Sequence, residues 1–100
     1  MYIYVLFLWQ VVKINQIIIY LSDYALAQGY YKEIIIQTRI EETGAYNDCH
    51  HMRAIKKTGN THYIKIEILC DVPAEARFVR VVGLTGGKPF YLKEVEVYKL

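Results

Sequence analysis

The chain has 100 residues, of which 54% are hydrophobic and 22% are charged, and its formal net charge at pH 7 is +2. These values are typical of one globular domain with a single hydrophobic core, and they exclude an intrinsically disordered chain. They give no reason to expect a nucleic-acid partner, which usually requires a clustered basic surface. The one adjacent basic pair, Lys56 and Lys57, is interpreted as part of a solvated loop.

The amino-terminal run, MYIYVLFLWQVV, is uncharged and ends at Lys13. It is too short for a membrane span, which needs about 20 apolar residues. It also lacks the basic front and the small-residue cleavage site of a secretory signal. The run is therefore predicted to be a buried strand. Because apolar sequence starts directly at Met1, we expect an amino-terminal portion of the domain to be absent.

Further apolar runs are rich in β-branched and aromatic residues, and Gly, Asn and Asp punctuate them, as is typical of strands and turns. Tyr24–Gln28 can form one helical turn, which Gly29 ends. Glu41–His51 is interpreted as a connecting loop. The predicted strands are Ile3–Val12, Ile14–Leu21, Tyr31–Ile40, Tyr63–Leu69, Arg77–Leu84 and Phe90–Tyr98.

Alternation is clearest in THYIKIEILC, where Ile64, Ile66 and Ile68 share one face and charged residues lie on the other. This pattern predicts an antiparallel strand with one face on the core. The runs IIIY and EIII are apolar on both faces and therefore suit central strands. Short strands with regular turn signals predict an all-β sandwich or barrel.

The last quarter of the chain, ARFVRVVGLTGGKPFYLKEVEVYKL, is predicted to be a terminal hairpin. Thr85-Gly86-Gly87 supplies the positive-φ residues of its turn. The apolar positions change parity at Lys93–Glu94, which predicts a β-bulge there. Residues that we expect to fill the core or brace its sheet are Phe78, Val79, Val81, Leu92, Val95 and Val97.

Several residues that can carry chemistry were considered as sites. Cys49, His50, His51, His62 and Cys70 have no paired ligand spacing of the kind that structural zinc sites show, so the histidines are interpreted as solvent-facing loop residues. The two cysteines form either one bridge or two reduced thiols.

The carboxylates show no catalytic pattern either. Glu41, Glu42, Glu94 and Glu96 are neighbours within single segments, and such spacing does not show two carboxylates facing one pocket. No phosphate-binding glycine loop and no GxSxG elbow is present. An enzyme is therefore not predicted.

Ten tyrosines is a high number for 100 residues. Tyr24, Tyr30 and Tyr31 flank the SDYALAQG loop, where their rings could stack on a sugar or on a partner side chain. The alternative is packing in the core, with the hydroxyl group at its rim.

Three stretches, taken in order, resemble the discoidin and coagulation-factor type C superfamily, and most closely its fucolectin branch. LWQVVKINQIIIY looks like three successive parts of the family's fold: a strand that contains a tryptophan, a short link, and a strand with the pattern I-x-x-I-x-I-Y, called the I-Y strand below. YNDC…HYIKIEILC resembles the cysteine pair around a late strand, and ARFVRV…YLKEVEVY is similar to the closing hairpin. The resemblance covers roughly Leu8 to Tyr98.

This resemblance implies an antiparallel jelly-roll β-sandwich of the galactose-binding-domain-like type, with ligands bound by loops at one end. Residues 1–100 then form one domain or a fragment of a larger one. It also implies a disulfide between Cys49 and Cys70, worth about 3 kcal/mol for a loop of about twenty residues. A disulfide would place the chain outside the cell or in the secretory lumen.

The resemblance also bears on calcium. Glu94 lies where the family's closing strand carries a calcium-ligating glutamate, and Lys93 stands in place of the family's preceding cysteine. A calcium cage needs about six oxygen ligands, so Glu94 alone is a weak candidate and no cofactor is firmly predicted.

The family's sugar site consists of an early-loop histidine and two arginines that flank an aspartate after the I-Y strand. Asp23 matches the aspartate if one residue is deleted, whereas both arginines and the early loop are missing. Arg77 matches the closing hairpin, where we expect its stem to pack on the sheet. The predicted ligand-binding residues are Ser22, Asp23, Tyr24, Gln28 and Tyr30.

Two functions are considered. The first is a non-catalytic recognition module, a divergent fucolectin-like domain without the usual fucose-binding arginines, which binds a glycan or glycoprotein through the loops Ser22–Gly29, Thr43–His51 and Thr58–His62. The second is a structural or assembly domain that self-associates through an unpaired edge at Met1–Val12.

Overall fold

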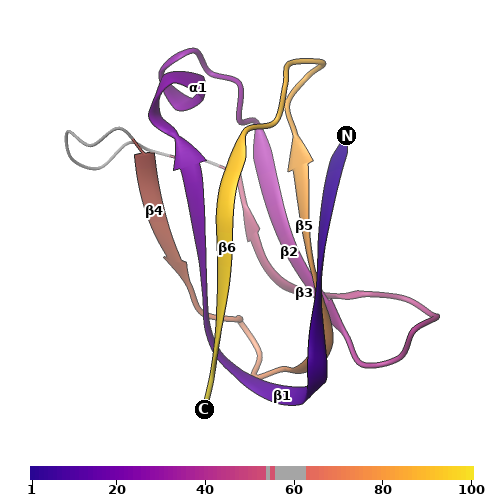
Figure 1. Ribbon diagram of the computed structural model, residues 1–100. Helices are drawn as coiled ribbons and strands as arrows, with labels where there is room; N and C mark the ends of the chain where they lie inside the picture. Colours follow the sequence, from indigo (N-terminus) through magenta and orange to yellow (C-terminus); the bar gives the residue numbers. More distant parts are fainter. Residues whose placement is uncertain (54, 56–62) are drawn as a thin grey trace.

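Six antiparallel strands and one helical turn make up the computed structural model, which describes residues 1–53, 55 and 63–100. The all-β prediction is therefore confirmed (Figure 1). Lys56, Lys57 and the segment Thr58–His62 lie outside the described residues. The elements are β1 (Tyr2–Ser22), α1 (Asp23–Ala27), β2 (Glu33–Arg39), β3 (Asn47–Met52), β4 (Tyr63–Ile68), β5 (Glu75–Leu84) and β6 (Leu92–Lys99).

The first strand, β1, belongs to both layers of the fold. Its first part pairs with β5, in a layer ordered β3-β2-β5-β1, and its second part pairs with β4 and β6 in the other layer. A register shift between Phe7 and Val12 marks the bend between the two parts, and Figure 1 shows β1 curving there. The sequence predicted two strands divided at Lys13, whereas the backbone stays extended through the bend and forms one.

The core lies between these two layers. In β2, Ile34 and Ile36 are fully buried while Ile35 between them is half-buried, and in β4 Ile64 and Ile68 are buried while Lys65 is exposed. The predicted alternation of β4 is thus confirmed. The runs IIIY and EIII do form central strand segments, since each has a paired strand on both sides.

The predicted terminal hairpin is wrong, although its turn is right. Gly86 and Gly87 have positive φ angles of 61° and 87°, and the Thr85 hydroxyl donates to the carbonyl of Lys88. Yet β5 pairs with β1 and β2, whereas β6 pairs with the second part of β1 in the other layer. The chain therefore crosses between the layers at this turn, because β1 offers β6 a free edge of apolar residues.

The predicted bulge at the start of β6 is confirmed. Leu92 is opposite Leu21 and Glu94 is opposite Tyr20, so Lys93 is the extra residue. This insertion lets Leu92, Val95 and Val97 all pack against the core despite their change of parity.

The segment Glu41–His51 was expected to be a loop, whereas Asn47–Met52 forms strand β3 at the edge of its layer. Its residues are mostly polar because an edge strand needs few buried side chains, and only Cys49 is buried here. His50 and His51 are therefore strand residues. His50 lies 2.9 Å from Asp71, and His51 lies 3.1 Å from Glu33.

The first part of β1 was expected to be buried, and it is exposed. Val5 is 50% exposed and Trp9 is 93% exposed. The reason is that Tyr2–Phe7 pairs with β5 on one side, while no other described strand pairs with it.

The disulfide between Cys49 and Cys70 is confirmed and joins the two layers. Cys49 lies in β3 of one layer, and Cys70 follows β4 of the other. The amide of Asp71 donates to the carbonyl of Cys49 at 2.8 Å, which adds a second link beside the bridge. The edges β3 and β4 are thereby held together.

Replacing Cys49 and Cys70 together by alanine should lower the free energy of unfolding by about 3 kcal/mol, because the bridge closes a 21-residue separation. Urea unfolding followed by circular dichroism measures this loss. A reducing agent should destabilise the wild type similarly and leave the double variant unchanged. Equal stability of all four samples would contradict a structural role for the bridge.

The hydrogen bond from the Tyr20 hydroxyl to Glu96, at 2.7 Å, predicts an alkaline loss of stability. This bond, with burial and the charges of Glu96 and Glu94, raises the pKa of Tyr20 to about 12. The folded chain thus holds the proton more tightly than the unfolded chain, so the stabilisation is complete below about pH 10 and is lost as pH rises towards about 12.

Urea unfolding measured across this pH range tests the effect. Tyr20→Phe and Glu96→Gln should each make the stability less dependent on pH. A wild-type slope in both variants would show that this hydrogen bond does not control the alkaline transition.

Candidate functional site

The loop after β1 is held in place by a small set of hydrogen bonds. The Ser22 hydroxyl caps α1 by accepting a hydrogen bond from the amide of Ala25 at 3.2 Å, and Ala25 is buried. Gln28 ends the helical turn, and Gly29 follows with a positive φ angle of 71°. The amide of Tyr30 then donates to the carbonyl of Ala25 at 2.9 Å. The single turn predicted from the sequence is confirmed, and it fixes the course of the loop.

Tyr31 ties this loop to the segment before β6. Its side chain is buried, its hydroxyl accepts the amide proton of Ser22 at 3.0 Å, and the same hydroxyl donates to the carbonyl of Tyr91. The Tyr31 ring packs edge-on against Phe90, with ring centroids 5.7 Å apart. Burial raises the pKa of Tyr31, so the hydroxyl keeps the proton that this bridge needs.

Three tyrosines consequently form a surface at this end of the molecule, which we call the tyrosine surface: Tyr24, Tyr30 and Tyr91. The Tyr24 and Tyr30 rings are perpendicular with centroids 6.2 Å apart, and the Tyr30 and Tyr91 rings are nearly parallel at 6.5 Å. Tyr24 is 63% exposed and Tyr91 is 47% exposed.

The hydroxyl group of Tyr30 holds its proton more firmly than a free tyrosine does. The pKa of Tyr30 is raised by the repulsion it would feel from an ionised Tyr24, by the hydrogen bond to Tyr24, by burial and by Tyr91. Neutral phenols both donate and accept hydrogen bonds, and their ring faces are apolar. The surface can therefore stack on a flat apolar group while bonding to hydroxyl or amide groups around it.

The predicted ligand-binding residues are only partly brought together. Of these residues, Tyr24 and Tyr30 are in ring contact. The Ser22 hydroxyl serves the helix cap, Asp23 lies in the first turn of α1, and Gln28 lies at its end. Binding by these three residues stays a prediction.

Tyr91 was not among the site residues predicted from the sequence. It is 60 residues away from Tyr31 in the chain, and it reaches the loop only because the segment after β5 crosses between the layers. The aromatic pair Phe90-Tyr91 directly after a glycine turn was the available signal. It was interpreted as the start of a hairpin strand.

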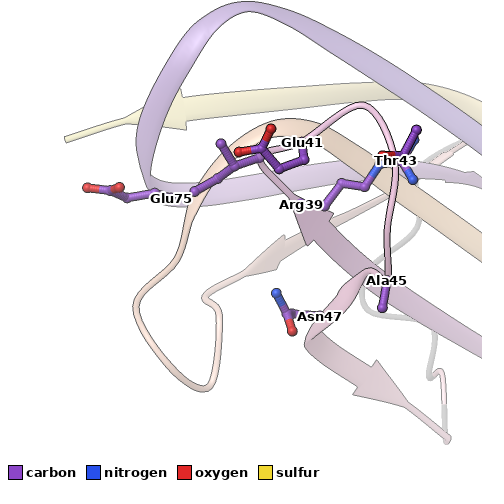
Figure 2. A pocket seen from close by; sticks show the side chains of 7 residues that line it. Arg39, Glu41, Thr43, Ala45, Asn47 and Glu75 are labelled. Carbon is purple, nitrogen blue, oxygen red and sulfur yellow. The ribbon is translucent and has the colours of Figure 1, made fainter.

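A surface pocket lies beside the β2–β3 connection. This pocket of about 380 Å³ is lined by Arg39, Glu41, Asn47 and Glu75 among others. Figure 2 shows the carboxylates of Glu41 and Glu75 turned to different sides. The Arg39 guanidinium donates to the carbonyl of Gly44 at 3.1 Å, so it already has a partner. The lining residues come from the predicted loop Thr43–His51 and from the strands beside it. Their charged groups do not point toward a common centre, so this pocket is not a candidate site.

The described histidines, cysteines and carboxylates form neither a metal cluster nor a thiolate site. Over residues 1–53, 55 and 63–100 no group of three His, Cys, Asp or Glu side chains could hold a metal ion, and Glu94 stands opposite Tyr20. His62 lies outside the described residues. Cys49 and Cys70 are bonded to each other, so neither sulfur is a thiolate nucleophile.

None of the described helices is long and apolar enough to cross a membrane.

In comparisons with protein-family models, curated proteins and solved structures, no family model, protein or structure matched the chain.

The close packing of Phe90 on Gly83, beneath the tyrosine surface, predicts that Gly83→Ala is destabilising. A Cβ atom at Gly83 would lie 2.5 Å from two ring atoms of Phe90, which itself packs against Tyr31. The ring has to move, at a cost of about 1–3 kcal/mol in unfolding free energy. Chemical denaturation measures this cost.

A double-variant cycle provides the control. In a Phe90→Ala background the clash is gone, so Gly83→Ala should be neutral or slightly stabilising there. If it costs the same in both backgrounds, the contact with Phe90 is not its cause.

Proposed function

We propose that this chain is a non-catalytic recognition module that binds a carbohydrate or glycoprotein through the tyrosine surface. The observation that carries the proposal is the ring cluster of exposed Tyr24, half-buried Tyr30 and exposed Tyr91, held in place by the buried Tyr31 hydroxyl. The fold that we propose is a divergent jelly roll of the fucolectin-like kind. Support for it comes from the resemblance in sequence and from the two layers that β1 joins.

The chemistry of this surface suits a sugar. A pyranose ring has a C–H face that stacks on an aromatic ring, and it carries hydroxyl groups that bond to phenols. The rings of Tyr24 and Tyr91 are already exposed on the folded chain, and exposed aromatic clusters commonly mark binding sites. Because the cluster lacks the two arginines of fucolectins, we propose a ligand specificity different from theirs.

Rigidity supports the same proposal. A surface whose rings are already in position loses little side-chain entropy when a ligand binds. Here the backbone bond from Tyr30 to Ala25 and the two bonds of the Tyr31 hydroxyl restrain the loop before any ligand arrives.

The non-catalytic part is supported by the state of the reactive groups. Both cysteines are in the disulfide, and His50 and His51 of β3 contact the carboxylates of Asp71 and Glu33. We further propose an extracellular or secretory-lumen location, because disulfides persist in oxidising compartments.

The test is a glycan array with the folded domain, followed by calorimetry on any sugar that binds. Tyr24→Ala and Tyr91→Ala should each weaken binding about tenfold or more, as the loss of a central aromatic contact does. Tyr98→Ala is the matched control, since Tyr98 is 45% exposed, like Tyr91, but lies near the other end of β6. It should leave the affinity unchanged.

Two results would count against the proposal. No binding to any glycan, with or without calcium, removes the carbohydrate part. Equal loss in Tyr98→Ala and Tyr91→Ala removes the tyrosine surface as the site.

A further inference from the structure

The edge of β1 carries an unpaired row of backbone groups. Tyr2–Phe7 forms six consecutive pairs with β5, and no other strand in the described part of the chain pairs with these residues. In an antiparallel strand, every second residue then turns its N–H and C=O groups away from the sheet. Such an edge is a template for another strand.

This edge differs from the other three in charge. The edge strands β3, β4 and β6 all carry ionisable residues, among them Asp48, Lys65, Glu67, Glu94 and Lys99. Charged residues on an edge oppose pairing with a further strand. From Tyr2 to Val12, β1 has no charged residue and no proline. It is the one edge in the described structure that lacks this protection.

Both faces of the edge are apolar and accessible. Ile3, Val5 and Phe7 lie on the outer face of the layer and are each about half exposed, while Tyr2 and Tyr4 lie on the other face and are exposed to a similar degree. A strand placed alongside would cover side chains on both faces as well as the backbone.

We propose that this edge binds the same edge of a second copy of this chain. A neutral, apolar edge offers no opposite charge to a charged strand, and burying an unpaired charge beside it costs free energy. A neutral, apolar strand therefore fits this edge best, and Tyr2–Phe7 of a second copy is such a strand. Paired residues of an antiparallel ladder share a face. A twofold axis at Val5 therefore sets Ile3 against Phe7 of the second copy, and Tyr4 against Leu6. The two β3-β2-β5-β1 layers then form one continuous sheet.

This inference is independent of the proposed ligand site, because no residue of the tyrosine surface lies on β1.

Sedimentation of the wild-type chain at about 1 to about 100 µM tests the proposal. The mass should rise with concentration from 11.7 kDa to twice that value. Amide hydrogen exchange of every second residue in Ile3–Phe7 should slow over the same range. A wild-type chain that stays at 11.7 kDa throughout overturns the proposal and leaves the edge to some other partner.

Val5→Glu separates edge pairing from misfolding. Val5 is opposite Arg80 in the β1–β5 ladder, so the introduced carboxylate gains a cationic neighbour within its own chain. In the dimer the two carboxylates would meet at the twofold axis, and dimerisation should weaken about 100-fold or more. Val5→Thr is the matched control of similar shape, and it should weaken dimerisation much less. Circular dichroism confirms that each variant is folded.

Mixing Val5→Glu with Val5→Lys tests the register. Each variant alone should be monomeric, and an equimolar mixture should recover a dimer because opposite charges then meet at the axis. Unchanged dimerisation of Val5→Glu would overturn the edge as the interface. If the wild type is dimeric but the mixture stays monomeric, the twofold axis does not lie at Val5.

Discussion

Pairing of one strand with three others is the constraint on which this structure depends. Because β1 pairs with β5 through its first part and with β4 and β6 through its second, the two layers share a continuous backbone. A bend between Phe7 and Val12 leads the chain from one layer into the other, and the isoleucines after it belong to the core between them. The disulfide then closes the opposite side, between β3 and β4. The core is thus bounded on one side by covalent backbone and on the other by a covalent crosslink.

Alternation along a strand is a local property, and what depends on it could be predicted from the sequence. The buried face of β4 and the extra residue at Lys93 follow from the spacing of apolar residues alone. Which strand lies beside which is not local. Pairing of β6 with β1 depends on an edge that β1 offers many residues away, so the apparent hairpin at Thr85-Gly86-Gly87 joins two layers. Likewise, apolar composition at Tyr2–Phe7 does not reveal that, among the described strands, only β5 pairs with this segment. Tyr91 was not predicted as a site residue because its place beside Tyr31 depends on the same non-local crossing between the layers.

The candidate site illustrates how a small sandwich can display aromatic rings without losing its core. Tyr31 is buried, and its hydroxyl bonds to both Ser22 and Tyr91, so the loop and the crossing segment hold each other. Ring packing through Phe90 onto Gly83 connects this pair to β5. Exposed rings supported in this way combine apolar contact with fixed position, which is what recognition of a neutral polyhydroxyl ligand requires.

The order in which the chain visits its layers has a kinetic consequence. Segments of the two layers alternate along the sequence, since β1 contributes to both, β2 and β3 belong to one, β4 to the other, β5 to the first and β6 to the second. Neither layer is a contiguous stretch that could form early on its own. Strand β6 can dock on β1 only after every strand between them has been synthesised. Folding should accordingly be slow, on the order of milliseconds to seconds, and it should proceed without a stable half-built sheet.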